Sequence, residues 1–202
     1  MQLVSLADVR SAADVLGGVA VHTSLVPCPW ADRSGYPSRL WVKPESLQPI
    51  GAFKLRGAYY AISRIPADIR ARGIVTHSSG NHGRAVAFAA REFGVPAVVV
   101  MPKVTPSVKI AAVEALGAEI VLVQPDERDS VMAEIAESRQ MSVVPPFDDA
   151  RVIAGQGTVG LEILADAPDV EVVLVPVGGG GLASGVATAV KAINPKIQVY
   201  GV

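Results

Sequence analysis

Short runs of aliphatic residues recur along the chain from residue 74 onward, and a longer stretch of mixed composition separates each run from the next. A continuous aliphatic run is typical of a strand buried in a parallel sheet, and the stretches of ~10 to 13 residues between the runs suit helices. Gly94 and Gly117 each end one of these helical stretches. The pattern predicts strands at residues 74–77, 97–101, 119–123, 142–144, 172–177 and 198–202, and helices at residues 83–93, 107–116, 128–140, 157–164 and 182–192.

The part of the chain before residue 65 has a less regular pattern. Residues 5–16 are expected to form a helix, with Ser5 as its N-cap and Asp8 in its first turn. A stretch rich in turn residues follows at 27–37, then a short strand at 39–43, a loop at 44–51 and a helix at 52–64. The alternation of strands and helices predicts an α/β fold with an open, mainly parallel sheet and right-handed crossovers.

Composition agrees with a buried core and excludes two classes of protein. Of the 202 residues, 50% are hydrophobic and 18% are charged, and the mean hydropathy is +0.38. Aromatic residues supply only 5%, so the apolar content is mainly aliphatic, which suits helices packed on a parallel sheet. These values exclude a disordered chain. No apolar run reaches the ~18 residues that a membrane span needs, so no membrane partner is expected.

Charge and cysteine content remove further possibilities. Lysine and arginine number 18 against 19 acidic residues, so no basic surface for nucleic acid is expected. The single cysteine, Cys28, rules out a disulfide framework and a zinc cluster built from cysteines. His22, His77 and His82 lie too far apart in the sequence for a recognisable metal site. We expect a cytoplasmic protein, because the N-terminus lacks the basic and apolar stretches of a signal peptide.

Four consecutive glycines, Gly178 to Gly181, carry the strongest chemical signal, and we call them the tetraglycine loop. They follow an expected strand and open an expected helix, so several backbone N–H groups can point at one anion, most naturally a phosphate. One alternative is a flexible turn. Another is a dinucleotide site with the pattern Gly178-x-Gly180-x-x-Ala183, but the loop comes late in the strand series, which weighs against it.

A second polar segment, residues 78–83, also lies between a strand and a helix, and we call it the asparagine loop. Its sequence is Ser-Ser-Gly-Asn-His-Gly. Hydroxyl, amide and backbone N–H groups at the start of a helix suit an anion such as a carboxylate. The alternative is ordinary helix capping, since Ser and Asn are preferred caps. One cap would explain one of these residues but hardly all of them.

Lys54 is the third candidate. It is expected in the first turn of a helix, between apolar neighbours. The positive end of the helix and the loss of hydration both lower the pKa of a lysine there, which makes the amine a better nucleophile. Taken alone, the segment also fits a solvated surface lysine.

Lys54, the asparagine loop and the tetraglycine loop occur in an order that resembles the fold-type II pyridoxal-phosphate enzymes, specifically the group of threonine/serine dehydratases and serine racemases. The resemblance covers nearly the whole chain. It implies a tryptophan synthase beta-like fold, with two open, mainly parallel sheet domains and helices on both faces. The matching segments are residues 43–49, 53–58, 78–83, 147–149, 153–158 and 178–181.

The resemblance implies a role for each candidate residue. Lys54 would bond to the aldehyde of pyridoxal 5'-phosphate and then remove the α proton of the substrate, while the cofactor supplies the electron-withdrawing chemistry. The implied reaction removes the β-hydroxyl of threonine or serine and gives a 2-oxo acid and ammonia. Phe53 and Asn81 would contact the cofactor ring, and the phosphate would bind at Gly178, Gly179, Gly180, Gly181 and Leu182. The substrate carboxylate would bind at Ser78, Ser79, Asn81 and His82.

The sequence departs from the family pattern at three positions and leaves the activity open. Ile50 and Ala52 stand where Thr or Ser is common, and Arg84 stands where Gln is usual. Ser79 gives the doubled serine that is similar to serine racemases, in which this serine handles a proton on the face opposite the lysine. Ser79 is therefore a second catalytic candidate, and racemase and hydroxyaspartate dehydratase activities remain alternatives. A catalytically inert fragment that only binds the cofactor is the alternative of another class.

The resemblance also implies the domain organisation. A small α/β domain is expected at residues 52–144, and a larger one is expected to combine residues 1–51 with 145–202. Members of the group typically run ~100 residues longer than this chain, so we expect the C-terminal third of the protein, which is the C-terminal part of the larger domain, to be missing here. A homodimer acting on a small amino-acid substrate is expected, and no metal ligand is identified.

Overall fold

Four parallel strands form the larger sheet of the computed structural model, which describes residues 3–28 and 39–202. Most of the stretch expected to be rich in turns, 27–37, lies outside these residues. The sheet has the order β5-β4-β3-β6, and β3 pairs with β4 so that Val75 lies beside Val98. The strands are β3 (Ile74–His77), β4 (Ala97–Pro102), β5 (Glu119–Val123) and β6 (Ser142–Val143).

Helices cover both faces of this sheet, as its continuous aliphatic strands predict. Val99 points to the face covered by α4 (Asn81–Glu92) and α5 (Ser107–Glu114). Val98 and Val100 point to the opposite face, where they pack with Ile135 of α6 (Arg128–Ser138). The expected fold class is therefore confirmed.

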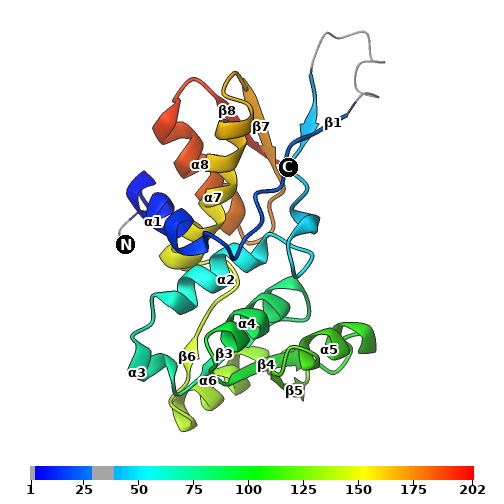
Figure 1. The fold of residues 1–202 in the computed structure, drawn as a ribbon. Coiled ribbons are helices and arrows are strands. Elements are labelled where there is room, and N and C mark those ends of the chain that lie inside the picture. Colours follow the sequence, from blue (N-terminus) through cyan, green and yellow to red (C-terminus); the bar gives the residue numbers. More distant parts are fainter. Residues whose placement is uncertain (1–2, 29–38) are drawn as a thin grey trace.

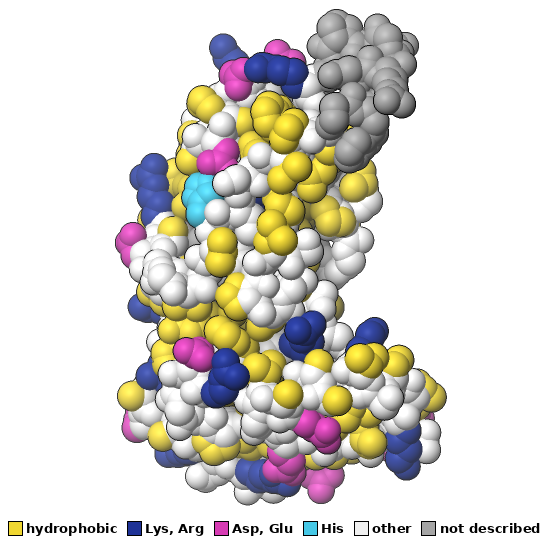
Figure 2. Space-filling model, turned by 45° about the vertical axis from the view of Figure 1, so that its right-hand side comes forward, with side chains coloured by type: hydrophobic (Ala, Val, Ile, Leu, Met, Phe, Trp, Pro, Cys, Tyr) yellow, Lys and Arg dark blue, Asp and Glu magenta, His cyan; other side chains and the backbone are white. Residues whose placement is uncertain are grey.

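A second lobe holds a pair of parallel strands, β7 (Val172–Val175) and β8 (Gln198–Gly201). Val173 and Val175 of β7 pack with Val186 of α8 (Gly181–Ile193) and Val159 of α7 (Ala150–Asp166). Helix α1 (Leu6–Leu16) lies against α7. Figure 1 shows the two lobes one above the other, and the space-filling view in Figure 2 is hollowed between them on one side.

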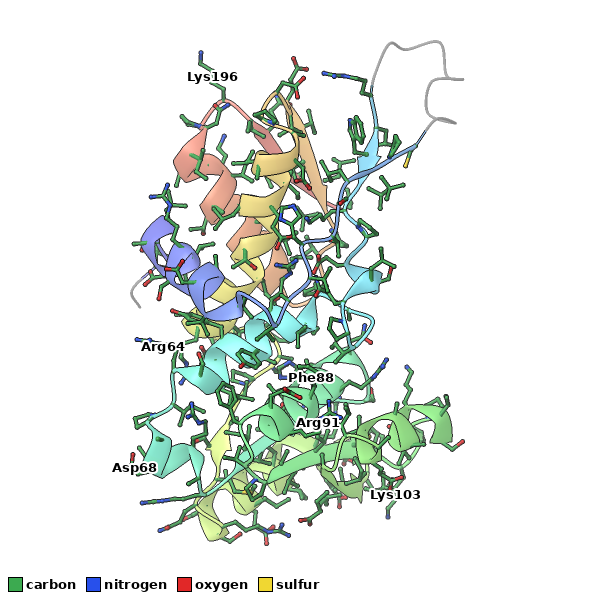
Figure 3. All side chains as sticks on the ribbon, viewed as in Figure 1. Arg64, Asp68, Phe88, Arg91, Lys103 and Lys196 are labelled. Atoms are coloured by element: carbon green, nitrogen blue, oxygen red, sulfur yellow. The ribbon has the colours of Figure 1, made fainter. Side chains whose placement is uncertain are left out.

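Helix α2 (Lys54–Ser63) joins the two lobes because it packs against both α4 and α7. Leu55 and Ile62 of α2 share a buried cluster with Val86 of α4 and Val152 of α7, and Phe88 packs against this cluster (Figure 3). The remaining elements lie near α2 in sequence: the strands β1 (Val26–Pro27) and β2 (Trp41–Val42), the 3-10 helix η2 (Glu45–Leu47) and the short helix α3 (Ala67–Arg70).

Helix α7 touches α2 on one side and α8 on the other with almost no side chain between the backbones. A Cβ on Gly155 would lie 2.6 Å from the carbonyl oxygen of Arg56 in α2. A Cβ on Gly185 of α8 would lie 2.3 Å from the carbonyl oxygen of Ile153 in α7. Contacts of this kind need glycine, because real Cβ atoms essentially never come so close.

The elements differ from the sequence expectations mainly at their ends. Helix α1 has the expected N-cap, since the Ser5 hydroxyl accepts the N–H of Asp8 at 3.3 Å. Helix α7 begins at Ala150 rather than at residue 157, because Asp149 caps it by accepting the N–H of Arg151 at 2.8 Å. Strand β1 and helix α3 were not expected. The division into domains at residues 52 and 145 stays a prediction.

In the part of the chain that the structure describes, no helix combines the length and the apolar character that crossing a bilayer demands.

Candidate active site

The site lies where the order of strands in the larger sheet reverses. From β3 the chain passes to β4 on one side, whereas β6 returns to the other side of β3. The carboxyl ends of β3 and β6 therefore open the crevice in which open α/β sheets bind their ligands. Residues 78–83 follow β3, and residues 144–147 follow β6.

Lys54 is the first residue of α2 and points toward the segment that follows β6. Its Nζ atom donates a hydrogen bond to the carbonyl oxygen of Pro146 and lies 5.4 Å from the centre of the Phe53 ring. The side chain is partly buried, and this burial lowers the pKa of its amine. Lys54 is therefore not a solvated surface lysine, and its amine loses a proton more readily than a free one.

The asparagine loop connects β3 to α4, and helix capping does not explain its polar residues. The N-cap of α4 is Gly80, and no side chain caps the helix. The Ser78 hydroxyl accepts the N–H of Gly80 at 3.2 Å, which orders the loop itself. Asn81, at the first position of α4, is exposed. The end of α4 without a side-chain cap can therefore receive the anion that the sequence predicts.

His82 is buried at the start of α4, with 3% of its surface exposed. Its Nε2 atom lies 3.0 Å from the carbonyl oxygen of Val144, and its Nδ1 atom is buried without a hydrogen-bond partner. Burial lowers the pKa of His82 to about 4, against the opposing effect of the Val144 hydrogen bond. The ring is thus neutral near pH 7 and donates its single N–H to Val144, so Nδ1 offers a lone pair to a bound group.

The tetraglycine loop follows β7 and opens α8. Gly180 has φ +85°, a left-handed conformation that favours glycine. A Cβ on Gly179 would lie 2.1 Å from Cδ1 of Phe147, whereas a Cβ on Gly178 would meet no atom within 4 Å. Among the described residues, no backbone carbonyl accepts a hydrogen bond from the backbone N–H groups of residues 178–182. The loop therefore presents free donors, as a phosphate requires.

The segment Pro146–Phe147 brings the candidates together. The Pro146 carbonyl accepts from Lys54, and the Phe147 ring lies on Gly179. Two residues earlier, Val144 accepts from His82. The structure thus gathers the lysine, the asparagine loop and the tetraglycine loop around residues 144–147. The roles of the individual residues stay predictions.

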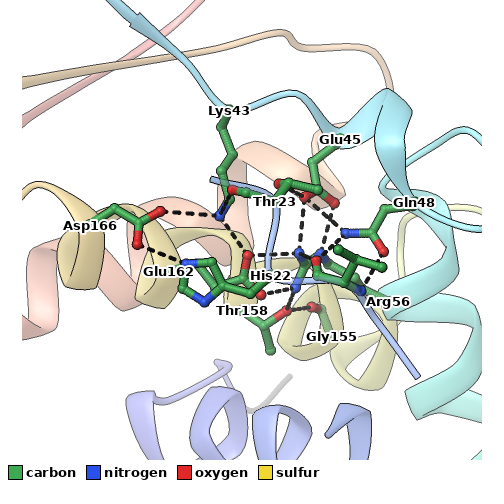
Figure 4. Close-up of polar contacts among 11 residues, drawn as sticks. His22, Thr23, Lys43, Glu45, Gln48, Arg56, Gly155, Thr158, Glu162 and Asp166 are labelled. Atoms are coloured by element: carbon green, nitrogen blue, oxygen red, sulfur yellow. Dashed lines mark hydrogen bonds and ion pairs between the residues drawn. The ribbon is translucent and has the colours of Figure 1, made fainter. Parts of the chain in front are cut away.

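Sequence reasoning missed the network that holds the start of α2. Arg56 is 1% exposed; its Nε donates to Glu45 at 2.8 Å, and its Nη1 donates to Glu162 at 2.6 Å (Figure 4). Lys43 adds a 2.6 Å ion pair to Glu162. Hydrogen bonds to both acids keep the pKa of Arg56 raised despite its burial. A charged residue two positions from Lys54, in an otherwise apolar helix, was the available signal.

The other two histidines lie next to acidic side chains. His77 ends β3 and pairs with Asp129 at 3.2 Å, and His22 pairs with Asp166 at 2.8 Å. Across residues 3–28 and 39–202, no three His, Cys, Asp or Glu side chains gather closely enough to hold a metal ion.

Known proteins resemble this chain over nearly all of its length. The L-threonine ammonia-lyase of Thermotoga maritima is 44% identical over 203 residues, which cover 99% of this chain and 50% of that protein. A crystal structure of a pyridoxal 5'-phosphate-dependent aspartate racemase matches with a TM-score of 0.95 and 38% identity, over 100% of this chain and 64% of that one. A maize serine racemase structure matches with a TM-score of 0.95 and 35% identity, over 99% and 61%.

The chain spans about half the length of the curated relatives it matches. The family described as pyridoxal-phosphate dependent enzymes matches residues 19–202, which include Lys54 and both loops. The resemblance seen in the sequence is therefore confirmed, together with the fold-type II architecture of the related structures. This chain belongs to the family of pyridoxal-phosphate dependent enzymes.

Proposed function

We propose that the chain carries the cofactor lysine, the carboxylate-binding asparagine loop and the phosphate-binding tetraglycine loop of a threonine or serine dehydratase. Such an enzyme eliminates the β-hydroxyl and releases a 2-oxo acid and ammonia. The observation that carries this proposal is the meeting of Lys54, His82 and the tetraglycine loop around residues 144–147. Identity of 44% to an L-threonine ammonia-lyase supports the choice of substrate.

The residues present fit pyridoxal phosphate. The free N–H groups of residues 178–182 suit its phosphate, and the space beside Gly178 admits an anion without a clash. Phe53 lies beside the Lys54 amine and offers an apolar surface for the ring. Asn81 stands exposed at the first position of α4, where its amide can bind the ring hydroxyl.

When bound, the cofactor supplies the electron sink that makes the α proton of an amino acid acidic. Lys54 accepts that proton in its neutral form, and the lowered pKa of its amine increases the population of that form. Ser78, Ser79 and Asn81 hold the substrate carboxylate at the start of α4. The His82 ring is held by Val144, and its Nδ1 atom can accept a hydrogen bond but cannot donate one to a carboxylate. The partial burial of Lys54 limits the access of water to the amine.

The direct test is the variant Lys54→Ala, with Lys196→Ala as a matched control on an exposed lysine that precedes β8, at the opposite end of the strand pair from the tetraglycine loop (Figure 3). The parent protein should bind pyridoxal phosphate with the visible absorption band of the lysine-bound cofactor and should release ammonia from threonine or serine. Lys54→Ala should lose the band and the turnover. A parent protein that binds no pyridoxal phosphate would contradict the proposal.

Ser79 supports a second candidate, an amino-acid racemase. Its hydroxyl lies in the loop between β3 and α4, and two of the related structures are serine racemases. Chiral analysis of serine after incubation with the L-isomer separates the two activities. D-serine that forms with the parent protein and disappears in Ser79→Ala would favour racemisation; 2-oxo acid alone would favour elimination.

We propose a cytoplasmic homodimer, on the resemblance alone. Sedimentation velocity of the purified chain tests the dimer, and fractionation of cells tests the location. A chain that binds the cofactor without turnover of any hydroxy amino acid would support the inert alternative.

A further inference from the structure

Arg84 is a cation with no acidic partner among the described residues. It lies in the first turn of α4, two residues after His82. The ion pairs of the described arginines involve Arg39, Arg56, Arg91, Arg139 and Arg151, but not Arg84. Its Nε atom is buried and has no hydrogen-bond partner. Fold stability alone does not explain this side chain, because a buried donor without a partner is costly and the positive end of a helix repels a cation.

The Arg84 side chain extends toward the turn that leads into Lys54. Its Nη1 atom lies 3.9 Å from the position that a Cβ on Gly51 would take. Gly51 turns the chain with φ +74°, three residues before Lys54. The guanidinium therefore lies between the start of α2 and the start of α4, the two helix ends that carry the candidate catalytic and carboxylate-binding residues.

Helix geometry places Arg84 next to Asn81. Residues three apart on a helix share one face, with their Cβ atoms ~5 to 6 Å apart. Arg84 thus stands one turn beyond Asn81, on the side of α4 that begins at the asparagine loop. An anion bound at the loop and a second anion bound at Arg84 would thus lie at neighbouring positions on one face of the helix.

We propose that Arg84 binds a carboxylate on the side chain of the substrate, so that the enzyme prefers a dicarboxylic β-hydroxy amino acid such as 3-hydroxyaspartate. This inference rests on the proposed dehydratase function and narrows its substrate class. Arginine suits the role because its planar group holds a carboxylate through two parallel hydrogen bonds. The reaction stays the same elimination: water leaves, water returns in hydrolysis, and 3-hydroxyaspartate yields oxaloacetate and ammonia.

The ratio of kcat/KM for 3-hydroxyaspartate to kcat/KM for threonine tests the inference. The parent protein should prefer 3-hydroxyaspartate, and Arg84→Gln should lower the ratio at least about 30-fold, because the side-chain carboxylate loses its partner. Arg84→Lys keeps the charge but loses the planar group with two parallel donors, so its ratio should lie between those of the parent protein and Arg84→Gln. Arg91→Gln is the matched control: it removes a cation from the exposed end of the same helix and should keep the ratio (Figure 3). An unchanged ratio in Arg84→Gln would overturn the proposal.

Thermal unfolding without cofactor gives a readout that does not depend on catalysis. Succinate should raise the Tm of the parent chain and of Arg91→Gln, but not that of Arg84→Gln, whereas the monocarboxylate butyrate should raise none of them. Equal stabilisation of Arg84→Gln, or none of the parent chain, would contradict the inference. Because Lys54→Ala should retain the succinate effect, a failure of the dehydratase proposal is distinguishable from a failure at Arg84.

Discussion

Gly178 and Gly179 are neighbours in the tetraglycine loop, yet the structure gives them different constraints. A methyl group on Gly179 would overlap the Phe147 ring, whereas a methyl group on Gly178 would enter open space. The first glycine after β7 is therefore not required by packing. A phosphate at the free N–H groups would require it, because the ligand must approach the backbone closely.

We expect Gly178→Ala to keep the stability of the chain within about 0.5 kcal/mol and to weaken the binding of pyridoxal phosphate. Gly179→Ala should destabilise the chain by ~1 to 3 kcal/mol through overpacking against Phe147, and the additional change Phe147→Ala should restore part of that loss. Chemical denaturation measures the first effect and cofactor titration the second. Unchanged cofactor affinity in Gly178→Ala would favour a simple turn.

The buried ring of His82 makes stability depend on pH. The pKa of His82 is lowered to about 4, from an ordinary value of 6.5. Between these values the unfolded chain binds a proton that the folded chain does not, so stability is present above pH 6.5 and is lost as the pH falls toward 4. Acidification from pH 7 to pH 5 should therefore cost about 2 kcal/mol through this one residue.

Urea denaturation at pH 7 and pH 5 measures this dependence, and His82→Gln should remove most of it. The carboxyl groups of Glu45 and Asp149, whose pKa values are lowered by Arg56 and Arg151 against the effect of burial, lose their contribution mainly below pH 4.5. An equal pH dependence in the parent chain and in His82→Gln would show that other groups dominate.

Helix α2 owes its position to the buried charges of Arg56 as much as to its apolar face. The guanidinium holds Glu45 of η2 and Glu162 of α7 at once. It thus ties the start of α2, and with it Lys54, to two other segments of the chain. Truncating one partner of a buried charge network destabilises the folded chain strongly, since it leaves other charges buried with fewer partners.

Arg56→Met should destabilise the chain by about 3 to 5 kcal/mol, because it leaves Glu45 without its cation and Glu162 with Lys43 alone. Arg139→Met is the matched control, since Arg139 pairs with Glu119 at 2.6 Å on the surface, with both side chains about half exposed. It should change the stability much less, because an exposed ion pair contributes little. Chemical denaturation compares the two, and similar losses would mean that burial does not set the strength of these pairs.

Sequence reasoning identified what is local in this fold. Aliphatic runs predicted the strands of the larger sheet, and glycine-rich or serine-rich turns predicted both loops, because each signal lies within a few neighbouring residues. The contact of Phe147 with Gly179 and the pairs of Arg56 could not be predicted, since they join residues far apart in the chain. The early start of α7 was missed because the cap, Asp149, follows two prolines that suggested a longer break.

Among the described residues, the two parallel sheets differ in how far their faces are covered. The larger sheet has helices on both faces, whereas β7 and β8 pack against α7 and α8 on one face only. On the other face Leu174 is 57% exposed and Tyr200 is 51% exposed. Contiguous exposed apolar groups of this kind promote association between molecules in solution.

Leu174→Glu should therefore reduce self-association of the 202-residue chain. Val108→Glu adds the same charge at an exposed apolar position of α5, away from β7, and serves as the control. Light scattering over a range of protein concentrations measures the effect. Equal improvement in both variants would assign it to net charge rather than to this face.

The two glycine contacts of α7 have a consequence for ligand choice. Helix α7 touches the lysine helix through Gly155 and the helix of the tetraglycine loop through Gly185, and in both places backbone lies directly on backbone. Side-chain rearrangement cannot lengthen or shorten such a spacing, so we expect a fixed distance between the Lys54 amine and the phosphate site. A compound with the same ring but no phosphate fills only one end of the site. We therefore expect the chain to prefer the phosphorylated vitamer, because the close approach of the three helices fixes the distance between the two ends of the site.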